Sequence, residues 1–146
     1  YEDSLNARSM RWLLEYMRRE TLKLMVVVGA RPNYMKAAPL IRALDELAAV
    51  EVDWPKVEIR VVHTGQHYDD SLSKYLLEEL SFPPVDEFLN VGSGSHGAQT
   101  GKILECFEPV LEKWWPDVLV VVGDVNSTLD CALVAAKSYR RLPDGR

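Results

Sequence analysis

The chain has 146 residues, 47% of them hydrophobic and 27% charged, and a net charge of −5. These values suit one globular domain with a full core, and they exclude nucleic acid or an anionic membrane as a general partner, because both bind through excess Lys and Arg. No apolar run approaches the about 18 residues of a membrane span. Cys106 and Cys131 lack metal-site or redox-motif spacing, which predicts reduced thiols in a cytoplasmic protein.

Residues 1–21 are expected to form a leader that is helical, because Met10, Leu13, Leu14 and Met17 recur at three- and four-residue spacing. The leader lacks the apolar core and small-residue cleavage site of a signal peptide. We therefore expect the folded domain to span residues 22–146.

Strands and helices alternate along the rest of the chain. Apolar runs predict buried strands at 23–29, 57–63 and 117–123, with a shorter strand within 85–91. Helical patterns follow at 34–50, 70–80, 98–114 and 127–138. This order predicts an α/β fold, a doubly wound, Rossmann-like parallel sheet with helices on both faces.

Polar side chains follow the first predicted strand. Arg31 and Lys36 lie just beyond it, and Asn33 can cap the helix expected from Tyr34. A helix N-terminus offers free N–H groups and the positive end of the dipole, so one interpretation is a diphosphate site, with Arg31 bidentate and Lys36 as a point charge. The other interpretation is that Arg31 pairs with a structural carboxylate and Lys36 is solvated.

Two more polar groups follow the other strands. Asp124 follows the third predicted strand and precedes a helix, so it can be either a helix N-cap or a catalytic carboxylate. His63, Gln66 and His67 cluster at the end of the middle strand, in a loop placed for ligand contacts. Ligands of doubly wound sheets bind beyond the carboxyl ends of the strands, where all these residues are expected.

Gly92, Gly94 and Gly97 form a G-x-G-x-x-G pattern. A dinucleotide-binding fingerprint of this kind should follow the first strand of its unit, and here it does not. The alternative is a loop whose Ser95 caps the next helix.

Segments at 29–40, 63–69, 91–100 and 123–128 together resemble the UDP-N-acetylglucosamine 2-epimerase family, in the family's order and approximate spacing. The resemblance covers about residues 22–143. It implies the N-terminal half of a GT-B-type two-domain fold, incomplete at the C-terminus. In this family UDP-GlcNAc and UDP-ManNAc interconvert at C2 of the sugar, through anti elimination of UDP to a glycal and its readdition.

The same resemblance implies partners and surroundings. UDP-N-acetylglucosamine is the expected substrate, neither NAD nor a metal takes part, and no nucleic acid or membrane is expected to bind. Full-length relatives are commonly homodimers, and the expected setting is cytoplasmic, in cell-envelope polysaccharide biosynthesis. Because the other half of the fold carries further catalytic groups, the chain alone is expected to be inactive.

By motif, the resemblance assigns substrate binding to Arg31, Lys36 and Asp124, and a catalytic role to Asp124. Gln66 and His67 match a segment that contacts a second UDP-GlcNAc, an activator, in some bacterial members.

The chain departs from the family pattern at several positions, among them Asn33 and residues 125–128. Asn33 stands where many members have Glu, and residues 125–128 replace a run of Thr, so the exact substrate stays open. Three alternatives accompany the epimerase interpretation. They are a catalytically silent fragment acting as a binding or assembly module, a hydrolysing epimerase that releases ManNAc and UDP, and a GT-B glycosyltransferase domain.

Overall fold

A computed structural model describes residues 20–48, 55–65 and 82–138 of the chain. The helix expected at 70–80 and all but the last two residues of the expected leader lie outside these ranges.

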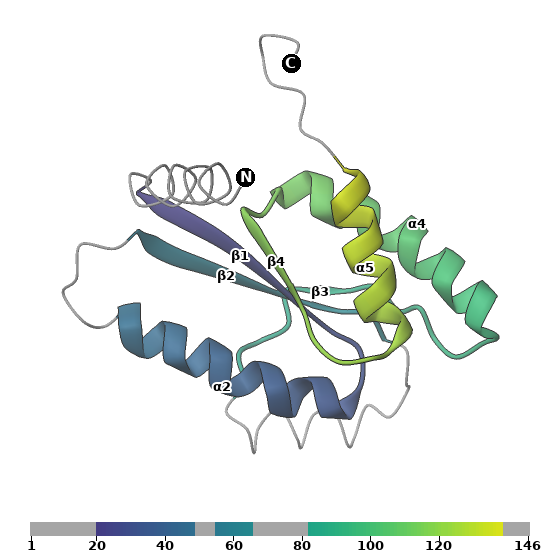
Figure 1. Cartoon of the computed structure of the whole chain (residues 1–146), viewed down its shortest axis with the longest axis horizontal. Helices are drawn as coiled ribbons and strands as arrows, with labels where there is room; N and C mark the ends of the chain where they lie inside the picture. The colour runs from purple at the N-terminus through teal and green to yellow at the C-terminus, as the bar shows by residue number, and fades with distance from the viewer. Residues whose placement is uncertain (1–19, 49–54, 66–81, 139–146) are drawn as a thin grey trace, which may run out of the picture.

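The described strands form one parallel sheet (Figure 1). They are β1 (Thr21–Val28), β2 (Lys56–His63), β3 (Glu87–Phe88) and β4 (Val118–Val121). Their order is β3-β2-β1-β4, and each neighbouring pair is parallel. The predicted parallel sheet is confirmed, and its strand order reverses between β1 and β4, which is where ligands bind in such folds.

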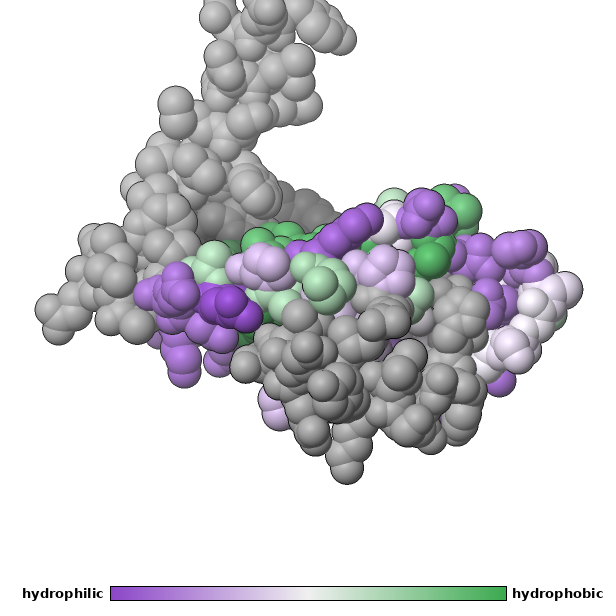
Figure 2. Space-filling model, turned by 90° about the horizontal axis from the view of Figure 1, so that it is seen from below, coloured by the Kyte–Doolittle hydropathy of each residue, from purple (hydrophilic) through white to green (hydrophobic). Residues whose placement is uncertain are grey.

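Helices cover both faces of the sheet, as predicted. α2 (Arg31–Ala48) lies on one face, whereas α4 (His96–Trp114) and α5 (Asn126–Lys137) lie on the other (Figure 1). Seen from the side of α2, the described surface is largely hydrophilic (Figure 2). None of the described helices combines the length and apolarity needed to cross a membrane.

Alternation along the strands divides the core into two layers. Val26 and its partner Val61 face α2, whereas Val27 and its partner Val62 face α4 and α5, because successive side chains of a strand point to opposite faces. The layer under α2 is completed by Leu24, Val28, Tyr34, Ala37, Ala38, Ile41 and Phe82. The layer under α4 and α5 is completed by Met25, Val91, Ile103, Phe107, Leu111, Cys131 and Val134.

β3 is shorter than the strand expected at 85–91. It spans only Glu87–Phe88. The N–H of Val61 donates to the Asp86 carboxylate at 2.7 Å, so a side chain replaces a ladder partner before β3 begins. Asn90 has a φ of +50° and turns the chain away after it.

The α4 boundary supports the loop interpretation of the glycine-rich segment. The Ser95 side chain accepts a hydrogen bond from the Ala98 N–H at 3.4 Å, as an N-cap does. The loop follows β3 at the far edge of the sheet rather than β1, so the dinucleotide fingerprint is wrong in its structural context.

We expect Phe107→Ala to lower the free energy of unfolding by about 3–5 kcal/mol, because Phe107 of α4 is fully buried in the layer against the sheet and its loss leaves a cavity. Urea denaturation followed by circular dichroism measures the change. The neighbouring Glu108→Ala is the control, since Glu108 is exposed and its loss should change stability by no more than about 0.5 kcal/mol. Equal losses in both variants would contradict the assigned core.

Candidate active site

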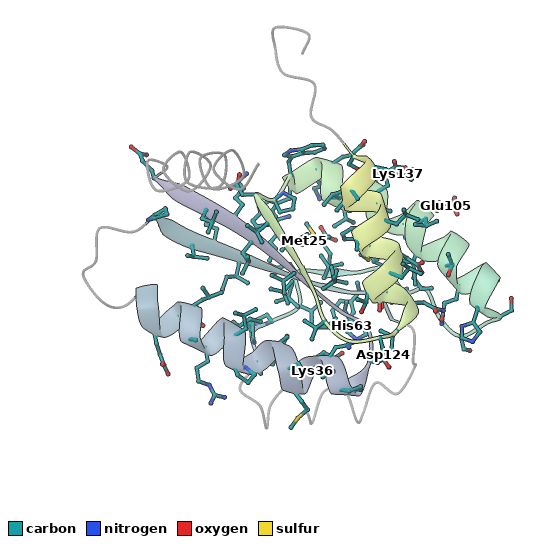
Figure 3. The ribbon with its side chains drawn as sticks, viewed as in Figure 1. Met25, Lys36, His63, Glu105, Asp124 and Lys137 are labelled. Carbon is teal, nitrogen blue, oxygen red and sulfur yellow. The ribbon has the colours of Figure 1, made fainter. Side chains whose placement is uncertain are left out.

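The carboxyl ends of β1 and β4 lie level with each other. Val27 pairs with Val121 in the last recorded register pair of these strands, and Gly29 and Gly123 each follow two residues later. The two loops that carry the expected cation and carboxylate therefore start side by side, as the sequence predicted. Figure 3 shows Lys36, His63 and Asp124 toward this end of the fold, which we call the strand-end edge, and Lys137 toward the other.

Asn33 has a different role from the predicted N-cap. Because α2 begins at Arg31 rather than at Tyr34, Asn33 lies inside the first turn, where only 1% of it is exposed. Its Oδ1 accepts hydrogen bonds from the N–H groups of Gly29 at 3.0 Å and Ala30 at 2.9 Å. A side chain at this helix position can reach back to the N–H groups before the helix, as in a capping box. These two N–H groups are thus already used and do not serve a bound anion.

The other end of the Asn33 amide reaches β4. Its Nδ2 donates to the Val122 carbonyl at 2.6 Å, across 89 residues of sequence. Thr128 Oγ1 donates to the same carbonyl at 3.1 Å from the first turn of α5. Next to it, Gly123 has a φ of +99°, and a Cβ at this position would lie 2.6 Å from Asn33 Nδ2. Only glycine fits here, for both its conformation and its size.

Asp124 is exposed at the strand-end edge, and the N-cap interpretation of this residue is wrong. The N-cap of α5 is Val125, which has no side chain able to accept a hydrogen bond. Asp124 makes no hydrogen bond or ion pair among the described residues. Its carboxylate is therefore available to a ligand, and it stands just before the positive end of the α5 dipole.

The cations are placed only in part. Lys36 is exposed on α2, and it forms no ion pair within the described ranges. Arg31 opens α2, but its side chain lies outside the description, as do Gln66 and His67 altogether. The choice between a diphosphate-binding and a structural Arg31 stays a prediction.

His63 is part of the core rather than of an open polar cluster. Its ring stacks on the Tyr34 ring, with the two ring centroids 5.7 Å apart. The centroid of the Phe88 ring lies 5.4 Å from that of His63. His63 is 7% exposed, and its Nδ1 has no hydrogen-bond partner among the residues that the structure describes. Burial lowers the pKa of His63 below its ordinary value, because an apolar environment disfavours the charged imidazolium.

A polar network that the sequence analysis missed joins α4 to α5. Asn126 Nδ2 donates to Gln99 Oε1 at 2.8 Å, and Gln99 Nε2 donates to the Gly92 carbonyl at 2.9 Å. Lys102 Nζ donates to the Val91 carbonyl at 2.9 Å. The polar first turns of α4 and α5 were the available signal, but only the packing of the two helices shows that these side chains meet and hold the glycine-rich loop.

Asp130 and Cys131 are buried on α5, and Cys106 is half-buried on α4. Burial raises the pKa of the Asp130 carboxyl, and a hydrogen bond from the Thr100 side chain opposes this shift. Burial and the neighbouring Asp130 raise the pKa of the Cys131 thiol, and both Cys106 and Cys131 are free thiols. Among the described residues, no group of three or more His, Cys, Asp or Glu side chains could hold a metal ion.

Comparison with known proteins decides the family. A family model described as UDP-N-acetylglucosamine 2-epimerase matches residues 50–142, more than half of the chain. The chain belongs to the UDP-N-acetylglucosamine 2-epimerase family. The resemblance carried by the four sequence motifs is confirmed.

Two curated relatives show the range of this epimerase family. The UDP-N-acetylglucosamine 2-epimerase of Methanocaldococcus jannaschii is 46% identical over 116 residues, which is 80% of this chain and 30% of the relative. The UDP-2,3-diacetamido-2,3-dideoxy-D-glucuronate 2-epimerase of Pseudomonas aeruginosa is 39% identical over 118 residues, which is 81% of this chain and 31% of the relative. The chain thus matches about 30% of the length of these relatives, their N-terminal portion.

Solved epimerase structures share the fold. The crystal structure of the Methanocaldococcus jannaschii UDP-GlcNAc 2-epimerase in complex with UDP-GlcNAc and UDP matches with a TM-score of 0.70 and 44% identity, over 80% of this chain and 30% of that one. The Neisseria meningitidis UDP-GlcNAc 2-epimerase bound to UDP-GlcNAc matches with a TM-score of 0.65 and 28% identity, over 78% of this chain and 29% of that one. These neighbours are of the GT-B type, as predicted.

We expect Gly123→Ala to lower the free energy of unfolding by at least about 1–3 kcal/mol, because alanine is strained at this positive φ and its Cβ meets Asn33. Gly101→Ala is the matched control. Gly101 lies within α4 with open space around an added Cβ, so alanine there should stabilise by about 0.5–1 kcal/mol. Chemical denaturation of both variants provides the comparison, and a neutral Gly123→Ala would contradict the geometry.

His63 should make stability depend on pH. The folded state favours the neutral imidazole, so below pH 6.5 the unfolded chain takes up this proton first and the free energy of unfolding falls as the pH is lowered. His63→Phe keeps an aromatic ring between Tyr34 and Phe88 but cannot titrate, so it should remove this part of the slope. Thermal melts of both proteins between acidic and neutral pH test this. Identical slopes would show that His63 is not buried neutral.

Proposed function

We propose that this chain provides one wall of the active site of a UDP-N-acetylglucosamine 2-epimerase. The wall is formed by a domain that begins with β1 at Thr21, one residue before the boundary expected at residue 22, and follows a proposed helical leader. The observation that supports this most directly is the strand-end edge, where the loop after β1 and the loop after β4 lie level and are joined through Asn33. The matching Methanocaldococcus jannaschii structure holds UDP-GlcNAc and UDP, and the matching Neisseria meningitidis structure holds UDP-GlcNAc.

The cations would serve the leaving group. Elimination breaks the bond between C1 of the sugar and the diphosphate oxygen, and UDP departs with the electron pair. Arg31 and Lys36 are proposed to bind this diphosphate, where positive charge stabilises the charge that develops on the oxygen. The Gly29 and Ala30 N–H groups do not contribute, since Asn33 accepts from both.

Asp124 would act on the sugar. Its exposed carboxylate, without a partner among the described residues, suits transfer of the C2 proton or support of positive charge near C1. Return of the proton to the opposite face of C2, and readdition of UDP at C1, completes the epimerisation. The proton is conserved and no redox step occurs, so the reaction as written needs no oxidant or reductant.

Substrate and assembly belong to the same proposal. UDP-N-acetylglucosamine is the proposed substrate, and the Pseudomonas aeruginosa relative makes a diacetamido uronate nucleotide the second sugar to test. Gln66 and His67 are proposed to contact a second nucleotide-sugar molecule. A homodimer, a cytoplasmic location and a role in cell-envelope polysaccharide biosynthesis stay predictions from the resemblance.

A chimera tests the function directly. The matching N-terminal portion of the Methanocaldococcus jannaschii epimerase is replaced by this chain, and conversion of UDP-GlcNAc to UDP-ManNAc is followed by NMR. We expect epimerisation by the chimera, and none by the chain alone, which matches about 30% of the relative. Release of free ManNAc and UDP would instead indicate a hydrolysing enzyme. A chimera that folds cooperatively but converts neither UDP-GlcNAc nor the diacetamido uronate nucleotide would contradict the proposal.

In that chimera, Asp124→Asn should lower kcat by about 10²–10⁴-fold, because the amide cannot take up or release the proton. Asp45→Asn is the matched control, since it removes the same charge from an exposed position on α2 beyond Lys36. Steady-state rates and melting temperatures of both variants are compared. Equal kcat values for the two variants would exclude Asp124 from the chemistry.

A further inference from the structure

The Asn33 amide is bound at both ends by groups of opposite kind. On one side Oδ1 accepts from two backbone N–H groups in the loop after β1, and on the other Nδ2 donates to a carbonyl at the end of β4. These partners decide the orientation of the amide, because the reverse orientation would face donors with donors and an acceptor with an acceptor. At 1% exposure, Asn33 meets these groups without competing water.

The carbonyl that receives this bond sits at the point where β4 becomes the Asp124 loop. Register pairing of β4 with β1 ends at Val121, so no ladder partner is recorded for Val122. Asn33 and Thr128 hold its oxygen instead, from α2 and α5 respectively. The direction in which the chain leaves toward Asp124 depends on this oxygen and on the left-handed Gly123 beside it.

We propose that Asn33 is the positioning residue of the site, and that it sets the separation of Asp124 from the loop of Gly29 and Ala30 that leads to Arg31. The proposal rests on the proposed function, in which these two loops contact opposite ends of one substrate. Thr128 binds the same oxygen but contacts only the β4 side. Asn33, by contrast, bonds to both loops.

A neutral amide is required for this role. A carboxylate in place of Asn33 keeps both acceptor contacts, yet it has no donor for the Val122 carbonyl and brings a negative charge against that oxygen. Asn33→Asp is therefore nearly isosteric and, of the three hydrogen bonds, removes only the one that links the loops. Asn33→Ala removes all three bonds, and Thr128→Val removes one bond to the same oxygen without touching the link.

NMR of the chain itself gives the first test. Asn33→Asp should shift the amide resonances of Gly123 and Asp124, far away in sequence, while Thr128→Val should leave those of Gly29 and Ala30 unchanged. Asn33→Ala should move the resonances of both loops. Unmoved Gly123 and Asp124 resonances in Asn33→Asp would overturn the positioning role, whatever the activity of the protein.

Kinetics of the chimera give the second test. Asn33→Asp and Asn33→Ala should lower kcat by about 10²-fold, the scale expected for a misplacement near 1 Å. The KM for UDP-GlcNAc should change by less than about 3-fold, because the loss falls on alignment rather than binding. Thr128→Val should lower kcat by less than about 3-fold.

The outcomes separate this proposal from a structural role and from the proposed function. If Asn33→Asp and Thr128→Val lower kcat equally, or if each loss of rate follows the fraction of folded protein, Asn33 has only a structural role. If the unmutated chimera folds but is inactive, the epimerase proposal fails, and the NMR result alone decides whether Asn33 aligns the two loops.

Discussion

The parallel pairing of β1 with β4 is the constraint on which the rest of the site depends. It places the ends of two strands level although they are separated by most of the described chain, and it does so at the point where strand order reverses. β2 and β3 extend the sheet on the other side of β1, so β1 and β4 are direct neighbours and their carboxyl ends lie next to each other. α2 and α5 each start beside this edge and bring their first turns to it. A ligand at this edge can meet residues from both loops at once.

Polar groups at this edge divide into those satisfied by the protein and those left exposed. Asn33 is buried and its side chain makes three hydrogen bonds, and Val122 accepts two hydrogen bonds where the ladder ends. His63 is enclosed by aromatic rings and favours its neutral form. Lys36 and Asp124, by contrast, are exposed and without partners among the described residues. The polar groups that hold the loops and the core are thus buried, whereas the groups proposed to contact an anionic substrate are exposed.

Asn33 is one of the buried polar groups, and it lies at a position where this chain departs from much of the epimerase family. The sequence resemblance marks Asn33 as a departure, since many members have Glu there. In this structure the amide nitrogen has a specific task that a carboxylate oxygen cannot perform, because its partner is a carbonyl. The departure is therefore matched to its surroundings here. Gly123 belongs to the same fit, because its φ is positive and a Cβ at this position would lie 2.6 Å from Asn33 Nδ2.

The sequence by itself determined the α/β class, the parallel sheet, its helices on both faces and the family, because apolar runs, helical periodicity and strand-end motifs are local signals. It also placed Arg31 and Asp124 at one edge, since parallel strands share the direction of their carboxyl ends. Only the tertiary structure decided that β3 is short, that Asp124 is not a cap, and that His63 lies in the core. It also decided that Asn33 bonds to Val122. Each of these outcomes depends on a partner far away in sequence or on burial by another element, and neither leaves a pattern in the residues nearby.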